Sequence, residues 1–456
     1  MDKEGRVPPV YRCGTLQYTL RGLMVLFVWL LGGDFAFTFF EQIFGRFVPL
    51  YLKDLQASNS LIGIMTGSIA GAVNLMFLPG ISRWSDECRS RWGRRIPFLA
   101  VAAPITVVSL ILVGFAPEIG TWLHSRVIAH IAPAVSLTAV ILTVLCGFVV
   151  SFHYFNMLLC NGFGWLVRDV VPYEWISRFL SWFRIIGTVS GIAFSWYVFP
   201  YVIIYRKAVC VGVGLFYLVT FMLMCWNVKE GEYPPPPVRE HKPGILKAYA
   251  AYFRTCFSIP IYRNGLLCSL IGGFSGCAGP FFLLFYRDTL HIDMGDLGKI
   301  FAIGSGVAAV AYLPMGWICH RCNPFRVVIT AGVGNLAVTV LSFFFLNNKE
   351  MLLVFTVIGS LFGVAGALGG AVMGIAVLPT AKFGQLTAAG NVVGCGIGIL
   401  GNYLVGVFMD LMHSNYRMAY VWSALSGLTL IPLILVYRGW KAHGGPDNYV
   451  APLPPD

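Results

Sequence analysis

Four ionisable side chains stand inside long apolar stretches of this sequence: Asp34, Glu41, His153 and Arg184. Insertion scales put the cost of an ionisable group near the centre of a bilayer at about 2.5–3.5 kcal/mol or more, so such groups mark functional positions. Carboxylates exchange protons, and the imidazole of histidine does so near neutral pH because its ordinary pKa is about 6.5. We therefore predict that Asp34, Glu41 and His153 take up and release protons.

The residues that follow Asp34 continue along one face of a helix. Phe37, Thr38 and Glu41 lie at positions i+3, i+4 and i+7, which share a helical stripe. A stripe of carboxylate, aromatic ring and hydroxyl is typical of a pocket for a small polar molecule. Glu41 lies nearer the outer end of this helix, where a simple salt bridge, with Arg46 for example, is the alternative to a proton-carrying role.

A second polar set lies on two later apolar stretches. His153 is expected at the depth of Asp34, and Asn156 and Trp165 follow it on a similar face. The alternative for His153 is an imidazole held by a nearby hydroxyl or carbonyl. A buried Arg184 needs an acidic partner, either Asp34 or an anionic substrate. The residues predicted to contact substrate are Phe37, Thr38, Asn156, Trp165 and Arg184.

The elements that must position these groups are membrane-spanning helices. The chain is 57% hydrophobic and 11% charged, whereas a soluble domain carries about 25% charged residues. A helix of about 20 apolar residues crosses a bilayer. Twelve stretches qualify, at 23–45, 60–81, 97–116, 134–166, 178–200, 203–226, 264–286, 297–318, 326–346, 351–377, 385–409 and 417–437. The first residues lack the pattern of a cleaved signal, so we expect the first span to be retained.

The positive charge of the chain follows its predicted topology. The formal net charge is +12, and most Lys and Arg residues fall in alternate loops, which by the positive-inside rule face the cytoplasm. An even number of spans then places both termini in the cytoplasm. The basicity thus indicates orientation and gives no support for a nucleic-acid partner.

The cysteines do not indicate a disulfide framework or a metal site. None of the twelve falls in a predicted external loop. Cys319 and Cys322 form a lone C-x-x-C in a tight loop, which is a weak signal. We predict no metal site and no cofactor.

The chain divides into two similar halves. A polar stretch with four consecutive prolines, 228–244, separates six predicted spans from six. Segment 170–192 aligns without gaps on 377–399, and a second match pairs Asp54 with Asp288 and Pro79 with Pro314. Tandem repeats around a midplane site are the plan of many secondary transporters. The predicted fold is therefore all-α, with two pseudo-symmetric bundles of six transmembrane helices.

The predicted boundaries follow from these spans. They are a cytoplasmic N-terminal segment (1–22), a first six-helix bundle (23–226), a cytoplasmic linker (227–263), a second six-helix bundle (264–437) and a cytoplasmic tail (438–456).

Three motifs carry a family resemblance. The stretch "SDECRSRWGRRIPF" at 85–98 resembles the loop between helices 2 and 3 of the glycoside–pentoside–hexuronide cation symporters and the plant-type sucrose transporters, within the major facilitator superfamily. The "GDFA" at 33–36 and the "DVVP" at 169–172 are similar to other motifs of these carriers. The resemblance implies a cytoplasmic gate motif made by Asp86, Arg91, Gly93, Arg94 and Arg95. Asp86 is expected to pair with one of these arginines or with a residue of the other half.

The sequence also departs from these families. Ser82 stands where glycine is usual, and Glu87 replaces a basic residue. Thr38 and Asn156 fall where melibiose-type carriers hold sugar with acidic residues, and the second span contains no acid for a sodium site of that type. His153 falls at the place of an aspartate of sucrose carriers. Protons are therefore favoured over sodium as the coupling ion.

The preferred hypothesis is a monomeric, proton-coupled symporter of a sugar or glycoside that works by alternating access in the inner or plasma membrane. One alternative on the same fold is an exporter or facilitator of an anionic metabolite such as a uronate, with Arg184 as counter-charge. A membrane-embedded enzyme is the alternative from another class. It is disfavoured because the sequence contains no H-E-x-x-H cluster.

Overall fold

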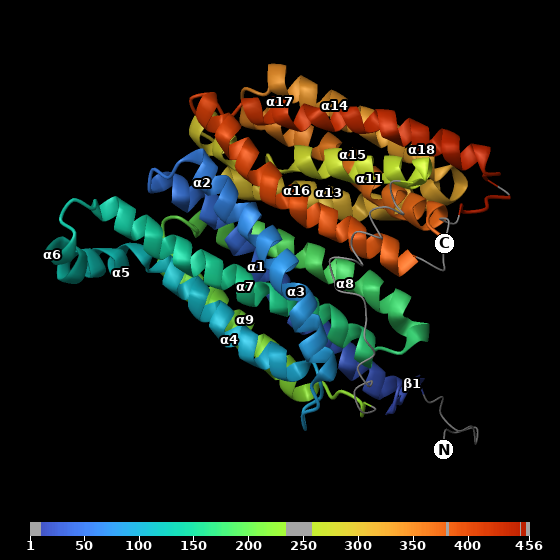
Figure 1. Ribbon diagram of the computed structural model, residues 1–456, viewed down its shortest axis with the longest axis horizontal. Coiled ribbons are helices and arrows are strands. Elements are labelled where there is room, and N and C mark those ends of the chain that lie inside the picture. Colours follow the sequence, from blue (N-terminus) through green and yellow to red (C-terminus); the bar gives the residue numbers. More distant parts are fainter. Residues whose placement is uncertain (1–10, 234–257, 380–382, 447, 453–456) are drawn as a thin grey trace. The chain divides into compact units, whose positions relative to one another are not determined.

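The computed structural model describes residues 11–233, 258–379, 383–446 and 448–452 (Figure 1). Almost every element in these ranges is a helix. A short antiparallel hairpin, β1 (Tyr11–Cys13) with β2 (Leu16–Tyr18), precedes the first one. Among the described residues, eleven helices are long and apolar enough to cross a membrane.

The elements of the first half begin with a helix of 35 residues. They are α1 (Leu20–Asp54), α2 (Asn59–Gly63), η1 (Ile64–Ser68), α3 (Ile69–Glu87), α4 (Ile96–Gly114), α5 (Ala116–Leu123), η2 (His124–Ile128), α6 (Ala129–Ile131), α7 (Leu137–Val170), α8 (Tyr173–Ala193), η3 (Phe194–Val198), η4 (Phe199–Tyr201) and α9 (Arg206–Asn227).

The second half is also helical. Its elements are α11 (Pro260–Gly276), α12 (Gly279–Leu284), η5 (Phe285–Thr289), α13 (Met294–Arg321), α14 (Pro324–Phe345), α15 (Lys349–Val377), α16 (Phe383–Leu411), α17 (Met418–Ala424), η7 (Leu425–Thr429) and α18 (Leu430–Ala442).

Each predicted span coincides with a helix or with consecutive helical segments. The helix α8 is not among the eleven apolar ones. It carries Glu174, Arg178 and Arg184, and these charges lower its hydropathy. A twelfth span through α8 and η3 therefore stays a prediction.

The chain folds into two compact units. Unit 1 contains residues 1–57 and 73–238, and unit 2 contains residues 58–72 and 239–456. The division near residue 238 falls inside the predicted linker at 227–263. The short segment 58–72 is different, because it packs with unit 2 although it precedes most of unit 1 in sequence. The continuous helix formed by α2, η1 and α3 thus begins in unit 2 and ends in unit 1, and the predicted domain boundaries did not anticipate this.

Aromatic side chains fill the core of unit 1. In this unit α4 packs against α7 and α9, and α1 packs against α8 and α9 (Figure 1). Phe44 stacks on Phe152 with ring centroids 4.0 Å apart, and Phe40 stacks on Tyr217 at 4.5 Å. Because lipid is as apolar as these side chains, close van der Waals packing holds the helices together, rather than hydrophobic exclusion. The stacked rings fix α1 against α7 and α9.

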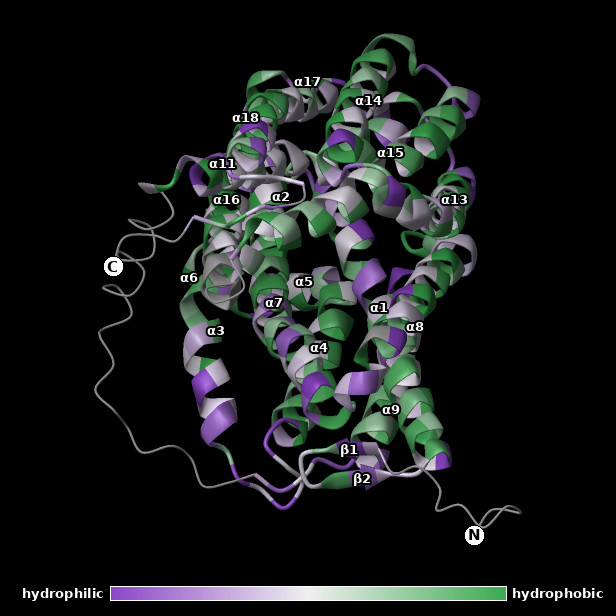
Figure 2. Cartoon of the chain, turned by 90° about the vertical axis from the view of Figure 1, so that its right-hand side faces the viewer, coloured by the Kyte–Doolittle hydropathy of each residue, from purple (hydrophilic) through white to green (hydrophobic). Residues whose placement is uncertain are grey.

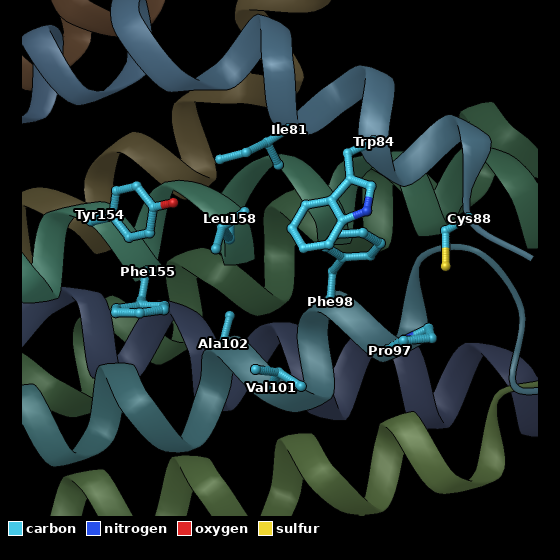
Figure 3. Close-up of a pocket in the computed structure, with 10 residues that line it drawn as sticks. All are labelled: Ile81, Trp84, Cys88, Pro97, Phe98, Val101, Ala102, Tyr154, Phe155 and Leu158. Atoms are coloured by element: carbon cyan, nitrogen blue, oxygen red, sulfur yellow. The ribbon is translucent and has the colours of Figure 1, made fainter. Parts of the chain in front are cut away.

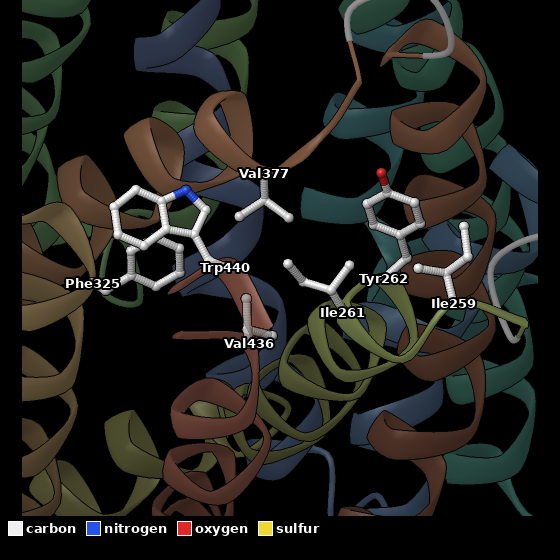
Figure 4. Packing of buried hydrophobic residues seen from close by; sticks show 7 residues of the cluster. All are labelled: Ile259, Ile261, Tyr262, Phe325, Val377, Val436 and Trp440. Carbon is white, nitrogen blue, oxygen red and sulfur yellow. The ribbon is translucent and has the colours of Figure 1, made fainter. Parts of the chain in front are cut away.

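Unit 2 has its own core, which Figure 4 shows. Phe325 and Trp440 lie with ring centroids 4.8 Å apart, beside Val436. The hydroxyl of Tyr449 donates to the carbonyl of Val377 at 2.9 Å, so a segment of the C-terminal tail is tied to the end of α15.

Candidate functional site

Asp34 lies buried halfway along α1, in unit 1. The residue is 2% exposed, and its Oδ2 atom has no hydrogen-bond partner in the part of the chain that the structure describes. A Cβ added to Gly187 of α8 would lie 3.7 Å from Oγ1 of Thr38 and 3.9 Å from Oδ2 of Asp34. The hydroxyl of Ser190, also on α8, donates to the carbonyl of Phe35 at 2.8 Å. The face of α8 that carries Gly187 therefore lies directly beside the carboxylate, at ordinary van der Waals distance for an added Cβ.

Glu41 binds side chains of α7. Its Oε1 atom accepts a hydrogen bond from Nδ2 of Asn156 at 3.0 Å and one from the thiol of Cys160 at 3.2 Å. Oδ1 of Asn156 is buried and has no partner among the described residues. Arg46, the alternative partner considered for Glu41, donates from Nη1 to Oγ of Ser195 at 2.6 Å. The structure thus joins two residues, Glu41 and Asn156, that the sequence placed on separate stripes.

His153 is buried among aromatic rings of unit 1. Its imidazole packs edge to face against Phe44, with centroids 4.8 Å apart, and lies near Phe152. It precedes Asn156 by one turn of α7.

Two of the predicted substrate contacts are occupied in packing. The ring of Phe37 is buried against Tyr217 and Phe221 of α9, with centroids 5.9 Å and 6.3 Å away. It therefore turns toward the core of unit 1, which the stripe beginning at Asp34 did not reveal. Trp165 contacts the guanidinium of Arg95 at 5.0 Å. It lies nine residues beyond Asn156 on α7, about 13 Å along the axis at 1.5 Å per residue.

Arg184 is exposed on α8 and makes no ion pair among the described residues. The salt bridge with Asp34, one of the two partners considered for a buried Arg184, is not formed, and the side chain is exposed rather than buried. Arg184 precedes Gly187, the point of close approach to Asp34 and Thr38, by about one turn.

A network of charges joins the loop between α3 and α4 to the end of α7. We call Asp86, Arg94, Arg95, Asp169 and Glu230 the arginine network. Arg94 donates two hydrogen bonds to Asp169, from Nε to Oδ2 at 2.9 Å and from Nη2 to Oδ1 at 2.8 Å. Arg95 donates from Nε to the same Oδ2 at 3.2 Å and from Nη2 to Oδ1 of Asp86. Such two-pronged pairs are the strongest ion pairs that arginine forms.

Glu230, just beyond α9, caps the start of α4. Its Oε1 accepts from the backbone N–H groups of Arg95 at 2.8 Å and Ile96 at 2.7 Å, and its Oε2 accepts from that of Arg94 at 2.9 Å. A carboxylate at a helix N-terminus is favoured by the unpaired N–H groups and the helix dipole. Gly93 has φ +108°, and a Cβ there would collide with the Glu230 carboxyl. Glycine is therefore required at position 93 by its conformation and by this contact.

Tyr233 completes this end of the network. Its hydroxyl donates to Oε2 of Glu230 at 3.0 Å, and its ring lies under the guanidinium of Arg94 at 4.1 Å. Burial, together with the charge of Glu230, raises the pKa of Tyr233 well above its ordinary value. The hydrogen bonds that Arg94 donates to Asp169 raise the pKa of Arg94.

The structure brings together most of the predicted gate motif. Asp86, Arg94 and Arg95 meet, and Gly93 supports them. Arg91 does not join them, since its guanidinium lies 5.2 Å from the ring of Trp92.

Sequence reasoning missed the roles of Asp169, Glu230 and Tyr233. Asp169 belongs to the DVVP motif and Glu230 follows an apolar span, so an acid at the end of a predicted span was the available signal.

A second cluster, in unit 2, was not predicted. Asp410 at the end of α16 accepts from the backbone N–H groups of Asn59 and Ser60, both at 2.9 Å, and from the side chains of the same residues. Asn59 is further held by Ser414 at 2.9 Å and by the hydroxyl of Tyr416 at 2.8 Å. We call these five residues the Asp410 cluster. It ties the start of α2 to α16.

Two glycines allow this contact between α2 and α16. A Cβ on Gly406 would collide with the carbonyl of Asn59, and one on Gly63 would collide with that of Asn402. Among the residues that the structure describes, no group of three or more His, Cys, Asp or Glu side chains could hold a metal ion.

Comparison with known sequences identifies a transport family. The sequence model of a family described as "MFS/sugar transport protein" matches residues 31–379. The sucrose transport protein SUT3 of Oryza sativa subsp. indica is 30% identical over 121 residues, which are 26% of this chain and 21% of that protein. The sucrose transport protein SUC3 of Arabidopsis thaliana is 33% identical over 72 residues, 15% of this chain and 12% of that protein. The matches span about a fifth or less of these relatives' length.

Solved structures of transporters share the fold. A bacterial homologue of the iron transporter ferroportin, in an inward-facing state, matches with a TM-score of 0.67 at 14% identity, over 91% of this chain and 99% of that one. The nucleoside transporter NupG matches with a TM-score of 0.65 at 13% identity, over 90% and 100% of the two chains. The xylose transporter XylE from E. coli, in an inward-open conformation, matches with 0.61 at 14% identity, over 91% and 96%. At these identities the likeness establishes the major facilitator fold alone.

Proposed function

The chain belongs to the family of MFS/sugar transport proteins, and we propose that it moves a sugar or glycoside together with a proton by alternating access. It is a multi-pass membrane transporter and not an enzyme. The proposal includes coupling to protons, the substrate class, a monomeric state and a location in the plasma or inner membrane.

The observation that carries the proton coupling is the buried carboxylate of Asp34. One of its oxygens has no hydrogen-bond partner within the described residues, and Arg184 does not pair with it. An ionised carboxylate is costly to bury without a donor or an opposite charge. Protonation removes that cost. Asp34 is therefore suited to alternate between a protonated and an ionised form as its access to water changes.

Thr38, Asn156 and Arg184 are the proposed substrate contacts. Thr38 shares with Asp34 the point where α8 approaches, and Oδ1 of Asn156 is buried without a donor. A sugar hydroxyl both donates and accepts hydrogen bonds, so it could donate to Oδ1 of Asn156 and pair with the hydroxyl of Thr38. Phe37 and Trp165 are left out of this set because their rings are engaged in packing and in the arginine network.

The proposed roles of Glu41 and His153 are secondary. Oε1 of Glu41 already accepts from Asn156 and Cys160, so a change in its protonation would alter a proposed substrate contact. His153 remains a candidate proton carrier through its place one turn from Asn156.

The decisive experiment is uptake into proteoliposomes under an imposed pH gradient. Asp34→Asn should abolish accumulation driven by the gradient while leaving exchange of substrate across the membrane, because an amide does not exchange a proton in this range. Glu41→Gln serves as the matched carboxylate control, and it should retain gradient-driven uptake with a raised KM. If Asp34→Asn accumulates substrate as well as the parent at every pH, the proton role of Asp34 is wrong.

The exposed Arg184 favours a second candidate, transport of an anionic sugar such as a uronate. Among the described residues it has no acidic partner, so an anionic substrate would supply one. Competition separates the two proposals. Inhibition of uptake by uronates but not by neutral sugars, lost in Arg184→Gln, would replace the neutral substrate with an anionic one.

A further inference from the structure

An apolar groove opens in unit 1 between the loop-side half of α3 and the helices α4 and α7 (Figure 3). Its volume is about 380 Å³, within the range of about 300–1,000 Å³ typical of small-molecule sites. Its walls include Ile81, Trp84, Phe98, Val101, Tyr154 and Leu158. The helix α3 buries few of its side chains, and the groove lies beside its last part, at Ile81 and Trp84.

The groove has a polar end and an apolar end. Cys88 and Pro97, at the two ends of the loop between α3 and α4, form one end. The indole of Trp84 packs edge to face on Phe98 at 4.8 Å, and its nitrogen lies on the side toward Cys88 (Figure 3). Tryptophan takes this place at the membrane interface, with the ring in the apolar layer and the N–H at the headgroups. From there the apolar walls run toward Tyr154, near the depth of His153.

The polar end carries positive charge. The segment 82–99 holds five arginines against Asp86 and Glu87. Figure 2 shows polar residues gathered at this end of α3 and in the loop that follows. Arg94 and Arg95 are committed to the arginine network. Arg91 is exposed and makes no ion pair among the described residues, so its charge, beside the ring of Trp92, is available to an anion at this end of the groove.

We propose that this groove binds an anionic phospholipid, with one acyl chain between α3, α4 and α7 and the phosphate at Arg91 and the Trp84 indole. An apolar channel with a basic mouth matches the two parts of such a lipid, and basic residues next to a span attract anionic headgroups. A zwitterionic lipid such as phosphatidylcholine has a phosphate but no net negative charge, so it would gain less from Arg91. The proposal concerns the bilayer rather than the transported substrate, and it holds whichever substrate is carried.

The bound lipid would act as part of the structure. It would fill the space that α3 leaves against α4 and α7, close to Asp86 of the arginine network. The leaflet is the one faced by the loop between α3 and α4, which the positive-inside pattern places on the cytoplasmic side.

Photo-labelling in nanodiscs tests this site. The full-length protein is placed in phosphatidylcholine nanodiscs containing a trace of phosphatidylglycerol whose acyl chain carries a diazirine, and labelled peptides are mapped by mass spectrometry. Label is expected on residues 81–88, 98–102 and 154–158. The same diazirine chain on phosphatidylcholine should label these peptides several-fold less.

Two pairs of variants sharpen the test. Arg91→Gln should lower labelling by phosphatidylglycerol about fivefold, as expected for one basic residue near a membrane surface, while Arg126→Gln, which removes a distant exposed arginine, should not. Val101→Trp fills the groove and should abolish labelling. Val108→Trp is the matched control, because Val101 and Val108 are 63% and 52% exposed on the same helix and only Val101 lines the groove.

Three outcomes would overturn the proposal. Equal labelling by the phosphatidylglycerol and phosphatidylcholine probes would mean that the groove contacts lipid without selecting its headgroup, as any membrane-facing surface does. Labelling unchanged by Val101→Trp would place the lipid elsewhere. Displacement of the phospholipid by a sterol added to the nanodisc would assign the groove to the sterol. All four substituted positions are exposed, so each variant is expected to fold, and its thermal denaturation confirms this.

Discussion

The arginine network and the Asp410 cluster each cap the start of a helix with a carboxylate, but the side chains around the two carboxylates differ. In each, a carboxylate accepts backbone hydrogen bonds from the first residues of a helix, Glu230 at α4 and Asp410 at α2. The arginine network surrounds its cap with further ion pairs, and two arginines share Asp169. The Asp410 cluster has a single charge, and its other members are neutral amides and hydroxyls.

This difference predicts different behaviour. Shared ion pairs are redundant, since losing one leaves others in place, and they weaken as salt screens them. A single carboxylate that satisfies several neutral donors has no substitute. Removing it leaves those donors buried and unpaired. The free-energy cost of the unpaired donors exceeds the stability that the hydrogen bonds contributed. The arginine network should therefore tolerate single changes, and the Asp410 cluster should not.

The largest effect is expected from Asp410→Ala. Four hydrogen bonds from Asn59 and Ser60 lose their acceptor, so we expect a loss of about 2–4 kcal/mol of stability. Thermal denaturation in detergent measures it. Asp293→Ala is the matched control, because Asp293 also caps a helix but accepts one bond, from Gly295 at 2.7 Å, and should cost about 1 kcal/mol. Equal losses for the two variants would show that the Asp410 cluster is no more than an ordinary cap.

A smaller effect is expected from Arg94→Lys. Lysine cannot reproduce the two-pronged contact with Asp169, but Arg95 still binds the same carboxylate, so the loss should be about 1–2 kcal/mol. The difference between the variant and the parent should shrink at 1 M salt, where the screening length is about 3 Å, but should not vanish, because the Arg94 and Asp169 side chains are only 21% and 14% exposed. Arg91→Lys, outside the network, should change nothing at either salt concentration. A loss that persists undiminished at high salt would contradict the redundant, screened network.

Asp86→Asn should affect transport more than stability. The Asp86 side chain is 50% exposed, so its pair with Arg95 contributes less than about 1 kcal/mol to folding. If the pair forms and breaks as the cytoplasmic side closes and opens, its loss shifts that equilibrium. We expect the turnover rate to fall about tenfold, or about 1.4 kcal/mol, with KM little changed. A raised KM with an unchanged turnover rate would rule out this gating role.

The smallest effect is expected from Tyr233→Phe, which removes one hydrogen bond to Glu230 and keeps the ring under Arg94. The loss should be about 0.5–1.5 kcal/mol. Because the pKa of Tyr233 is raised above its ordinary value, the phenol stays protonated in the folded state throughout the range of about pH 6 to 9. The loss should therefore be constant over that range in thermal denaturation. A loss that disappears toward pH 9 would mean that the phenol ionises in the folded protein.

Hydropathy and local motifs carried much of the information about this fold. Each predicted span coincides with a helix, because a chain in lipid must satisfy its backbone internally and present apolar side chains. The loop motif identified Asp86, Gly93, Arg94 and Arg95 as a set, since they are close in sequence and the structure keeps them close. Asp34 was identifiable for the same local reason, a carboxylate within an apolar span.

What the sequence did not reveal are contacts between distant segments. The periodicity placed Phe37 on one stripe with Asp34, but only the packing of α1 against α9 turns its ring toward Tyr217. Periodicity assigns a residue to a face of a helix, and which neighbour covers that face depends on tertiary packing.

By itself, then, the sequence determined the long apolar helices, the buried position of Asp34 and most of the arginine motif, because each depends on residues that are near one another in the chain. The tertiary structure decided the partners. Glu230 caps a helix more than 130 positions away, with Arg94 at a separation of 136, and Asp410 binds Asn59 at a separation of 351. A carboxylate at the end of a span can serve any helix that ends at the same depth, and only folding selects which one it caps.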